Sequence, residues 1–144
     1  IYNIETRVGT DGKPYIMEVS PRGGGNRLSE MLRFATGVDL IKMAVKSAVG
    51  EENDQLEMPV YNGFWAEIIL HSDRDGIFDE VKINNELFED NIVEIDLWVK
   101  KGDKVNAFRG ANDAIGTVVA RFETEREMSS FVKFIHEHIT VLVN

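Results

Sequence analysis

Two glutamates near the start of the 144-residue chain, Glu5 and Glu18, are the residues whose type and spacing best suit chemistry. Between them, Asp11-Gly12 joins two runs rich in strand-forming residues, and this dipeptide is typical of a two-residue type I′ turn. Counting outward from that turn places Glu5 directly opposite Glu18. Like charges that face each other across two strands are destabilising, and a bound cation reverses that effect. The pair therefore predicts a divalent metal site.

The same count predicts the rest of the hairpin. It pairs Thr10 with Lys13, Gly9 with Pro14, Val8 with Tyr15, and Thr6 with Met17. Alternation then gives two faces. The face expected to join the core holds Ile4, Thr6, Val8, Tyr15, Met17 and Val19. The face expected to carry the site holds Asn3, Glu5, Arg7, Ile16, Glu18 and Ser20. A merely solvated face, or a register slip of one residue, is the alternative to a metal site.

A glycine-rich segment with two arginines, residues 20–27, follows the second predicted strand. Consecutive glycines let backbone amides approach a ligand closely, and Arg22 and Arg27 supply positive charge, so the segment suits anionic oxygens. Glycine runs also occur as mobile connections. The segment alone does not separate these two interpretations.

Together these features resemble a known family. The stretch from Tyr2 to Gly50 resembles the C-terminal part of an ATP-grasp domain, whose metal-bearing strand typically reads Glu-x-Asn-Pro-Arg before a glycine run. Here that strand reads Glu18-Val19-Ser20-Pro21-Arg22, and two helical patterns follow around Thr36-Gly37-Val38-Asp39. Ser20 departs from the usual asparagine, but the Glu-Val-Ser-Pro-Arg version occurs in the formate-dependent glycinamide ribonucleotide transformylase branch.

The resemblance implies a carboxylate–amine ligase that uses ATP and Mg²⁺ (or Mn²⁺). Glu5 and Glu18 would ligate the metal ions that bridge the nucleotide phosphates, and Arg22 would contact phosphate or the activated carboxylate. A small-molecule carboxylate would be converted to an acyl phosphate, which an amine then attacks, with release of ADP and phosphate. Hard cations such as Mg²⁺ prefer carboxylate and phosphate oxygens and neutralise the charge on a transferred phosphoryl group.

Composition narrows the classes of partner. The net charge of −9 and the lack of a basic run argue against nucleic acid. The chain has no cysteine, and no apolar run approaches the about 20 residues that a membrane-spanning helix needs. We therefore expect a cytoplasmic protein without a membrane partner, and homo-oligomeric assembly is compatible with the sequence. Because the chain begins at Ile1 inside a predicted strand, we interpret it as a fragment that is inactive alone, with the nucleotide-binding parts upstream.

The predicted fold class is α+β, in three parts. Residues 1–50 are expected to form the C-terminal part of an ATP-grasp domain, with Gly37 ending its first helix and Asp39 capping its second. The acidic residues 51–62 are expected to be a linker. Residues 63–144 alternate short strand-like runs with turns and are expected to form an accessory antiparallel-sheet domain with a closing helix. The stretch from Lys101 to Gly116 resembles the tail domain of several carboxylate–amine ligases.

Within the third part, the Asp73–Gly76 segment is predicted as a hairpin turn, since the rest of a calcium-loop motif is missing. Thr124 and Glu127 form a capping box that predicts a helix from Glu125 to about His138. His136 and His138 point to different sides of that helix and cannot share one metal ion. Together with His71, they are expected to be structural or solvated.

Two functions remain open at this point. The first is a fragment of an ATP-dependent ligase. The alternative is a non-catalytic regulatory or assembly domain derived from an ATP-grasp scaffold, with Ser20 as a trace of lost turnover. A plain interaction domain would require Glu5, Glu18, Pro21, Arg22 and the glycine run to coincide by chance. Lysines and a glycine-rich loop upstream would favour the enzyme.

Overall fold

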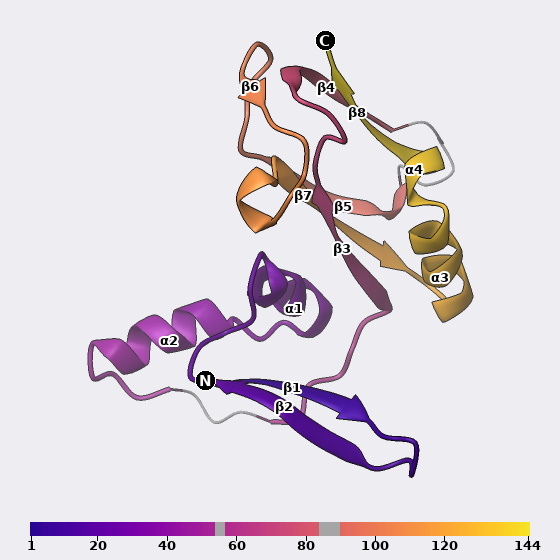
Figure 1. The fold of residues 1–144 in the computed structure, drawn as a ribbon. Helices are drawn as coiled ribbons and strands as arrows, with labels where there is room; N and C mark the ends of the chain where they lie inside the picture. The colour runs from indigo at the N-terminus through magenta and orange to yellow at the C-terminus, as the bar shows by residue number, and fades with distance from the viewer. Residues whose placement is uncertain (54–56, 84–89) are drawn as a thin grey trace. The chain divides into compact units, whose positions relative to one another are not determined.

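The computed structural model describes residues 1–53, 57–83 and 90–144. The chain divides into two compact units, Ile1–Tyr61 and Asn62–Asn144 (Figure 1). Both units contain helices and strands, and every pairing between named strands is antiparallel. The predicted α+β fold class is therefore confirmed.

The first unit consists of a hairpin followed by two helices. β1 (Asn3–Val8) pairs with β2 (Pro14–Ser20), and α1 (Leu28–Thr36) precedes α2 (Leu40–Ala48). Gly37 ends α1 with a left-handed φ of 77°, as predicted. Asp39 caps α2, because its carboxylate accepts a hydrogen bond from the amide of Lys42 at 2.8 Å.

The hairpin loop is longer than the predicted two-residue turn. Gly9 donates to the carbonyl of Lys13 at 2.9 Å and accepts from the amide of Gly12 at 3.0 Å, so the loop comprises residues 10–12. Gly12 has a φ of 75°, which matches the common three-residue loop that ends in a left-handed residue. The carboxylate of Asp11 stabilises the loop by accepting from the Lys13 amide at 3.1 Å and the Tyr15 hydroxyl at 3.0 Å.

The extra loop residue corrects the predicted register. The partners in the structure are Val8 with Pro14, Arg7 with Tyr15, and Thr6 with Ile16. The pairs predicted for Thr10, Gly9, Val8 and Thr6 are therefore wrong. A bulge next to this stretch leaves Met17 as an extra residue and restores the pairing of Glu5 with Glu18. Direct partners share a face, and Arg7 lies on the face of Glu5 because the two are two residues apart in β1. Tyr15, the partner of Arg7, therefore lies on the face of Glu5, and Ile16 lies on the opposite face. Both positions are the reverse of those predicted.

The apolar hairpin residues that were expected to join the core are exposed. Val8 is 68% exposed and Met17 is 61% exposed, and Ile4, Tyr15 and Val19 are each more than half exposed. In the part of the chain that the structure describes, this sheet has two strands, and a hairpin cannot bury a face by itself.

In its described residues, the second unit contains two three-stranded sheets. In the first, β7 (Gly116–Phe122) lies between β3 (Phe64–Leu70) and β5 (Ile92–Leu97). In the second, β4 (Gly76–Ile83) lies between β6 (Lys104–Val105) and β8 (Ile139–Val143). β3 and β4 are thus in different sheets, so the hairpin turn predicted at Asp73–Gly76 is instead a crossing between sheets. Asp75 holds this crossing, because its Oδ1 accepts from the amide of Ala107 at 2.8 Å.

The capping box predicted for the C-terminal helix is confirmed. Thr124 Oγ1 accepts from the Glu127 amide at 3.2 Å, and Glu127 Oε2 accepts from the Thr124 amide at 3.1 Å. The helix is shorter than predicted, since α3 (Glu125–Lys133) ends at Phe134 and the short α4 (Ile135–His138) follows. The chain then enters β8, a strand that was not anticipated, where β-branched residues pair with β4.

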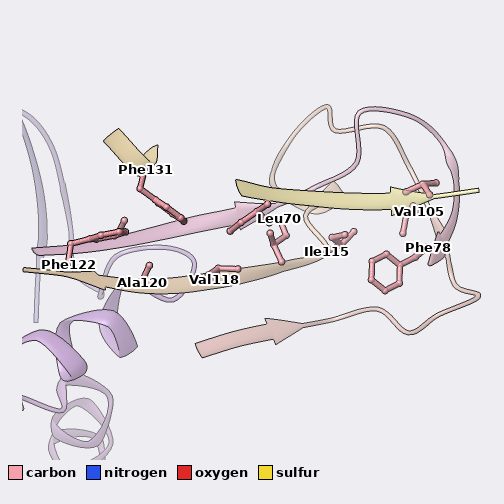
Figure 2. Close-up of a cluster of buried hydrophobic side chains, with 11 residues drawn as sticks. Leu70, Phe78, Val105, Ile115, Val118, Ala120, Phe122 and Phe131 are labelled. Carbon is pink, nitrogen blue, oxygen red and sulfur yellow. The ribbon is translucent and has the colours of Figure 1, made fainter. Parts of the chain in front are cut away.

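The core of the second unit lies between its sheets and α3. Phe131 of α3 is fully buried, and its ring centroid lies 5.1 Å from that of Phe122 in β7. On its other side, the Phe131 ring stacks on His138 at 5.3 Å. Figure 2 shows how the buried cluster continues from this contact through Val118 of β7 and Leu70 of β3 towards Phe78. Among the described residues, no helix is both long and apolar enough to cross a membrane.

Candidate functional site

The candidate site lies at the end of the hairpin that is remote from its loop. Glu5 in β1 and Glu18 in β2 are direct cross-strand partners, which confirms the predicted pairing. Both side chains are exposed. Two carboxylates in this position repel each other. They form a pair of acidic oxygen donors that is open to solvent.

Ser20 contacts this pair directly. Its hydroxyl donates a hydrogen bond to Oε1 of Glu18. Residues two apart in a strand share a face, so Ser20 belongs to the same face as the two glutamates. The bond orients the Glu18 carboxylate and leaves Oε2 as its second acceptor atom.

Arg22 follows the strand at an exposed position. Its Nη1 donates to the carbonyl of Gly23 at 2.9 Å, which uses one of the five N–H donors of a guanidinium. This hydrogen bond goes to the loop backbone rather than to Glu5 or Glu18. The structure thus brings the two glutamates and Ser20 together, and holds Arg22 against the glycine segment.

The glycines of this segment have different roles. A Cβ atom on Gly24 would collide with the Leu28 side chain, and one on Gly23 would lie 2.9 Å from Ser29 Oγ, so both positions pack closely on α1. A Cβ atom on Gly25 would meet nothing within 4 Å. Among the described residues, Asn26 is the one non-glycine with a positive φ, 52°. The sequence reasoning did not single it out, although asparagine is enriched in this conformation and such residues cluster at functional sites.

The carboxylate oxygens of Glu5 and Glu18 suit Mg²⁺ better than Zn²⁺ as metal ligands. Among the described residues, no three His, Cys, Asp or Glu side chains come together as a metal-binding group. A zinc site usually takes three or four protein ligands. Mg²⁺ is usually held by one or two carboxylates, with water and substrate phosphates in its other positions. The Glu5–Glu18 pair therefore fits a Mg²⁺ ion that arrives with a phosphorylated ligand.

Residues 68–144 match the family described as L-amino acid ligase C-terminal domain 2. A curated relative, an uncharacterized protein of Sinorhizobium fredii, is 31% identical over 119 residues. The match covers 82% of this chain and 24% of the relative. The chain thus spans about a quarter of that relative's length.

Several solved structures share the fold over 99% of this chain. Phosphoribosylglycinamide synthetase from Anaerococcus prevotii has a TM-score of 0.72, 24% identity and 37% of its own chain covered. L-amino acid ligase from Bacillus licheniformis has a TM-score of 0.71, 16% identity and 36% coverage. The biotin carboxylase domain of Hydrogenobacter thermophilus 2-oxoglutarate carboxylase, in complex with magnesium ADP and bicarbonate, has a TM-score of 0.72, 14% identity and 32% coverage. The fold is that of the C-terminal part of ATP-grasp ligases.

Proposed function

The chain belongs to the L-amino acid ligase C-terminal domain 2 family, and we propose that it is part of an ATP-dependent ligase that joins a small carboxylate to an amine. The direct pairing of Glu5 with Glu18 carries the proposal, because it supplies two acidic donors on a fold shared with a structure that binds magnesium ADP. We assign the activity to the full-length protein.

In this proposal Glu5 and Glu18 hold Mg²⁺ (or Mn²⁺). When bound, the metal would neutralise phosphate charge and orient the transferred phosphoryl group. Ser20 is a positioning residue, since its hydroxyl holds one oxygen of Glu18. Arg22 binds an anionic oxygen of phosphate or of the activated carboxylate, because its planar guanidinium can form two parallel hydrogen bonds to such a group.

The proposed reaction has two steps. The carboxylate attacks the γ-phosphorus of ATP, which gives an acyl phosphate and ADP. The amine then attacks the acyl carbon, the C–O bond to phosphate breaks, and the amine loses a proton. Positioning and charge stabilisation supply most of the catalysis in phosphoryl transfer, which fits a site with two carboxylates and an arginine.

The test is ADP and phosphate release by the full-length protein with Mg²⁺-ATP across paired carboxylates and amines. We expect Glu18→Gln to lower substrate-dependent release by about 100-fold or more, since the metal contributes several kcal/mol to the transition state. The matched control is Glu52→Gln, which changes an exposed glutamate beyond α2 and is expected to keep the wild-type rate. An unchanged rate in Glu18→Gln would remove the proposed role of the pair.

The same experiment distinguishes the ligase from the alternative function. A folded protein that binds nucleotide but releases no ADP with any substrate pair would support a regulatory or assembly domain. Ser20, at the position where the resemblance places an asparagine ligand, is the observation that favours this alternative.

A further inference from the structure

A second cross-strand pair lies beside Glu5 and Glu18 on the same face of the hairpin. Asn3 pairs directly with Ser20, and the register runs without a shift from this pair to the two glutamates. Residues two apart in a strand share a face, and direct partners share it too. The four side chains therefore form one group on this face, with two carboxylates at one end and an amide and a hydroxyl at the other.

The two glutamates fill part of the ligand shell of a Mg²⁺ ion. Mg²⁺ requires near-ideal octahedral geometry, and two carboxylates leave the other positions to water, substrate phosphate or further protein oxygens. In the part of the chain that the structure describes, no third Asp, Glu, His or Cys side chain joins the pair. A further protein ligand from these residues would therefore be an uncharged oxygen.

The cross-strand pairs on either side of the two glutamates differ in what they offer a cation. Towards the loop, the next pair on this face is Arg7 with Tyr15. A guanidinium has no acceptor atom and repels a cation, and the Tyr15 hydroxyl donates to Oδ2 of Asp11 at 3.0 Å. Away from the loop, Asn3 and Ser20 both carry uncharged oxygens. On this face, a neutral ligand is therefore expected from the Asn3–Ser20 side.

Asn3 is the better suited of these two residues. The Ser20 hydroxyl already donates to Oε1 of Glu18, whereas none of the hydrogen bonds among the described residues involves the side-chain amide of Asn3. Asn3 is also half-buried, although all other residues of its strand are exposed. A partly enclosed side chain loses less freedom when it binds, and asparagine oxygens hold Mg²⁺ in other phosphoryl-transfer sites.

We propose that Asn3 is a third protein ligand of the metal, through its side-chain Oδ1, and that Ser20 acts on Glu18 rather than on the metal. The proposal rests on the proposed function, since it needs a cation at the Glu5–Glu18 pair. It adds a ligand that neither the charge nor the spacing of the glutamates indicates. Because the amide is uncharged, it completes more of the shell without repelling the phosphates that share the ion.

Titration of the full-length protein with Mn²⁺ in the presence of ADP tests the proposal, with free Mn²⁺ followed by electron paramagnetic resonance. Glu18→Gln defines the part of the binding that depends on the glutamate pair. Asn3→Ser is expected to weaken this part about tenfold, because water replaces the amide oxygen. The matched control is Asn106→Ser, which changes an exposed asparagine of the second unit and should keep the wild-type affinity.

An exchange of the two partners separates ligation from a structural role. The double variant Asn3→Ser with Ser20→Asn returns an amide to the same end of the site from the opposite strand. It is expected to recover most of the affinity that Asn3→Ser loses. Neither position belongs to the buried core, so both variants are expected to fold, and urea unfolding without metal checks this.

The possible results distinguish the two proposals. Mn²⁺ binding that does not depend on Glu18 would overturn both the metal site and the role of Asn3. Glu18-dependent binding with the wild-type affinity in Asn3→Ser would leave the metal site in place and overturn the role of Asn3. A loss in Asn3→Ser that the exchange does not recover would assign Asn3 a structural role and overturn its ligation as well.

Discussion

Glu5 lies directly opposite Glu18, and the register of the hairpin changes by one residue immediately beside this pair. The three-residue loop shifts the pairing in one direction, and the bulge that contains Met17 shifts it back. A bulge increases the local twist and re-aims the neighbouring side chains, and bulges are frequent beside active sites. The two glutamates are thus opposed at the point where the strand geometry changes.

Replacing Glu5 by lysine separates the effect of the like-charged pair on stability from its proposed role in metal binding. In the absence of divalent metal, Glu5→Lys is expected to raise the free energy of unfolding by up to about 1 kcal/mol, because opposite charges replace like charges across the strands. The same change is expected to abolish Mg²⁺-dependent ADP release by the full-length protein. Urea unfolding without Mg²⁺ and the release assay measure the two effects. Glu52→Lys, at an exposed position outside the strands, should change neither. A less stable Glu5→Lys protein would show that the two carboxylates do not repel each other.

Local signals in the first unit were readable from the sequence. The end of α1 at Gly37, the cap of α2 at Asp39 and the pairing of Glu5 with Glu18 all agree with the structure. The length of the hairpin loop could not be predicted from the sequence, because a left-handed Gly12 fits both a two-residue turn and a three-residue loop. The bulge at Met17 has no signal of its own in a single sequence. The correct pairing of the glutamates therefore came from two deviations that offset each other.

The ion pair between Asp79 and Lys101 gives the second unit a pH dependence. Lys101 Nζ lies 2.5 Å from Asp79 Oδ1. The hydrogen bond from Lys101 lowers the pKa of Asp79 below its ordinary value of 3.8, and the same bond raises the pKa of Lys101 above its ordinary value of 10.5. The contribution of Asp79 to stability is therefore present above its unfolded-state pKa and is lost as the pH falls through the lowered pKa. That of Lys101 is present below its unfolded-state pKa and is lost as the pH rises through the raised one.

Asp79→Asn is accordingly expected to flatten the acid limb of the stability curve. The urea midpoint of the wild-type chain should fall between about pH 5 and about pH 2 by more than that of the variant. Asp90→Asn changes an exposed aspartate elsewhere in the same unit and should keep the wild-type slope. Identical slopes for wild type and Asp79→Asn would mean that the pair is not formed in solution.

Phe131 is expected to anchor α3 to the sheet. Phe131→Ala should lower the free energy of unfolding by about 3–5 kcal/mol, because it removes a fully buried ring that packs on Phe122 and His138. Phe134→Ala removes the same side chain three residues further along the chain, at the residue that ends α3, where Phe134 is 42% exposed. Its effect in urea unfolding should be clearly smaller. Equal losses would place the energetic contribution in the helix end rather than in the buried contact.

The order of the strands in the second unit could not be predicted from the sequence. The capping box at Thr124 was predictable because it is local, whereas the partners of β3 and β4 lie far along the chain, in β7 and β8. No spacing rule relates His71 to His136, although both line one cavity of about 220 Å³ beside β3, α4 and β8. A single sequence gives strand signals but not the order of strands within sheets.

β5 packs so closely on the start of β7 that we expect position 116 to require glycine. A Cβ atom there would collide with the carbonyl oxygen of Asp96 and lie 3.1 Å from Leu97 Cα. Backbone atoms of a paired strand cannot move aside easily, so Gly116→Ala should lower the free energy of unfolding by about 1–3 kcal/mol. Gly110→Ala is the matched control, because its backbone is extended and a Cβ atom there would meet nothing within 4 Å. Urea unfolding followed by the fluorescence of Trp65 and Trp98 measures both variants. A Gly116→Ala chain as stable as Gly110→Ala would show that β5 does not pack this closely on β7.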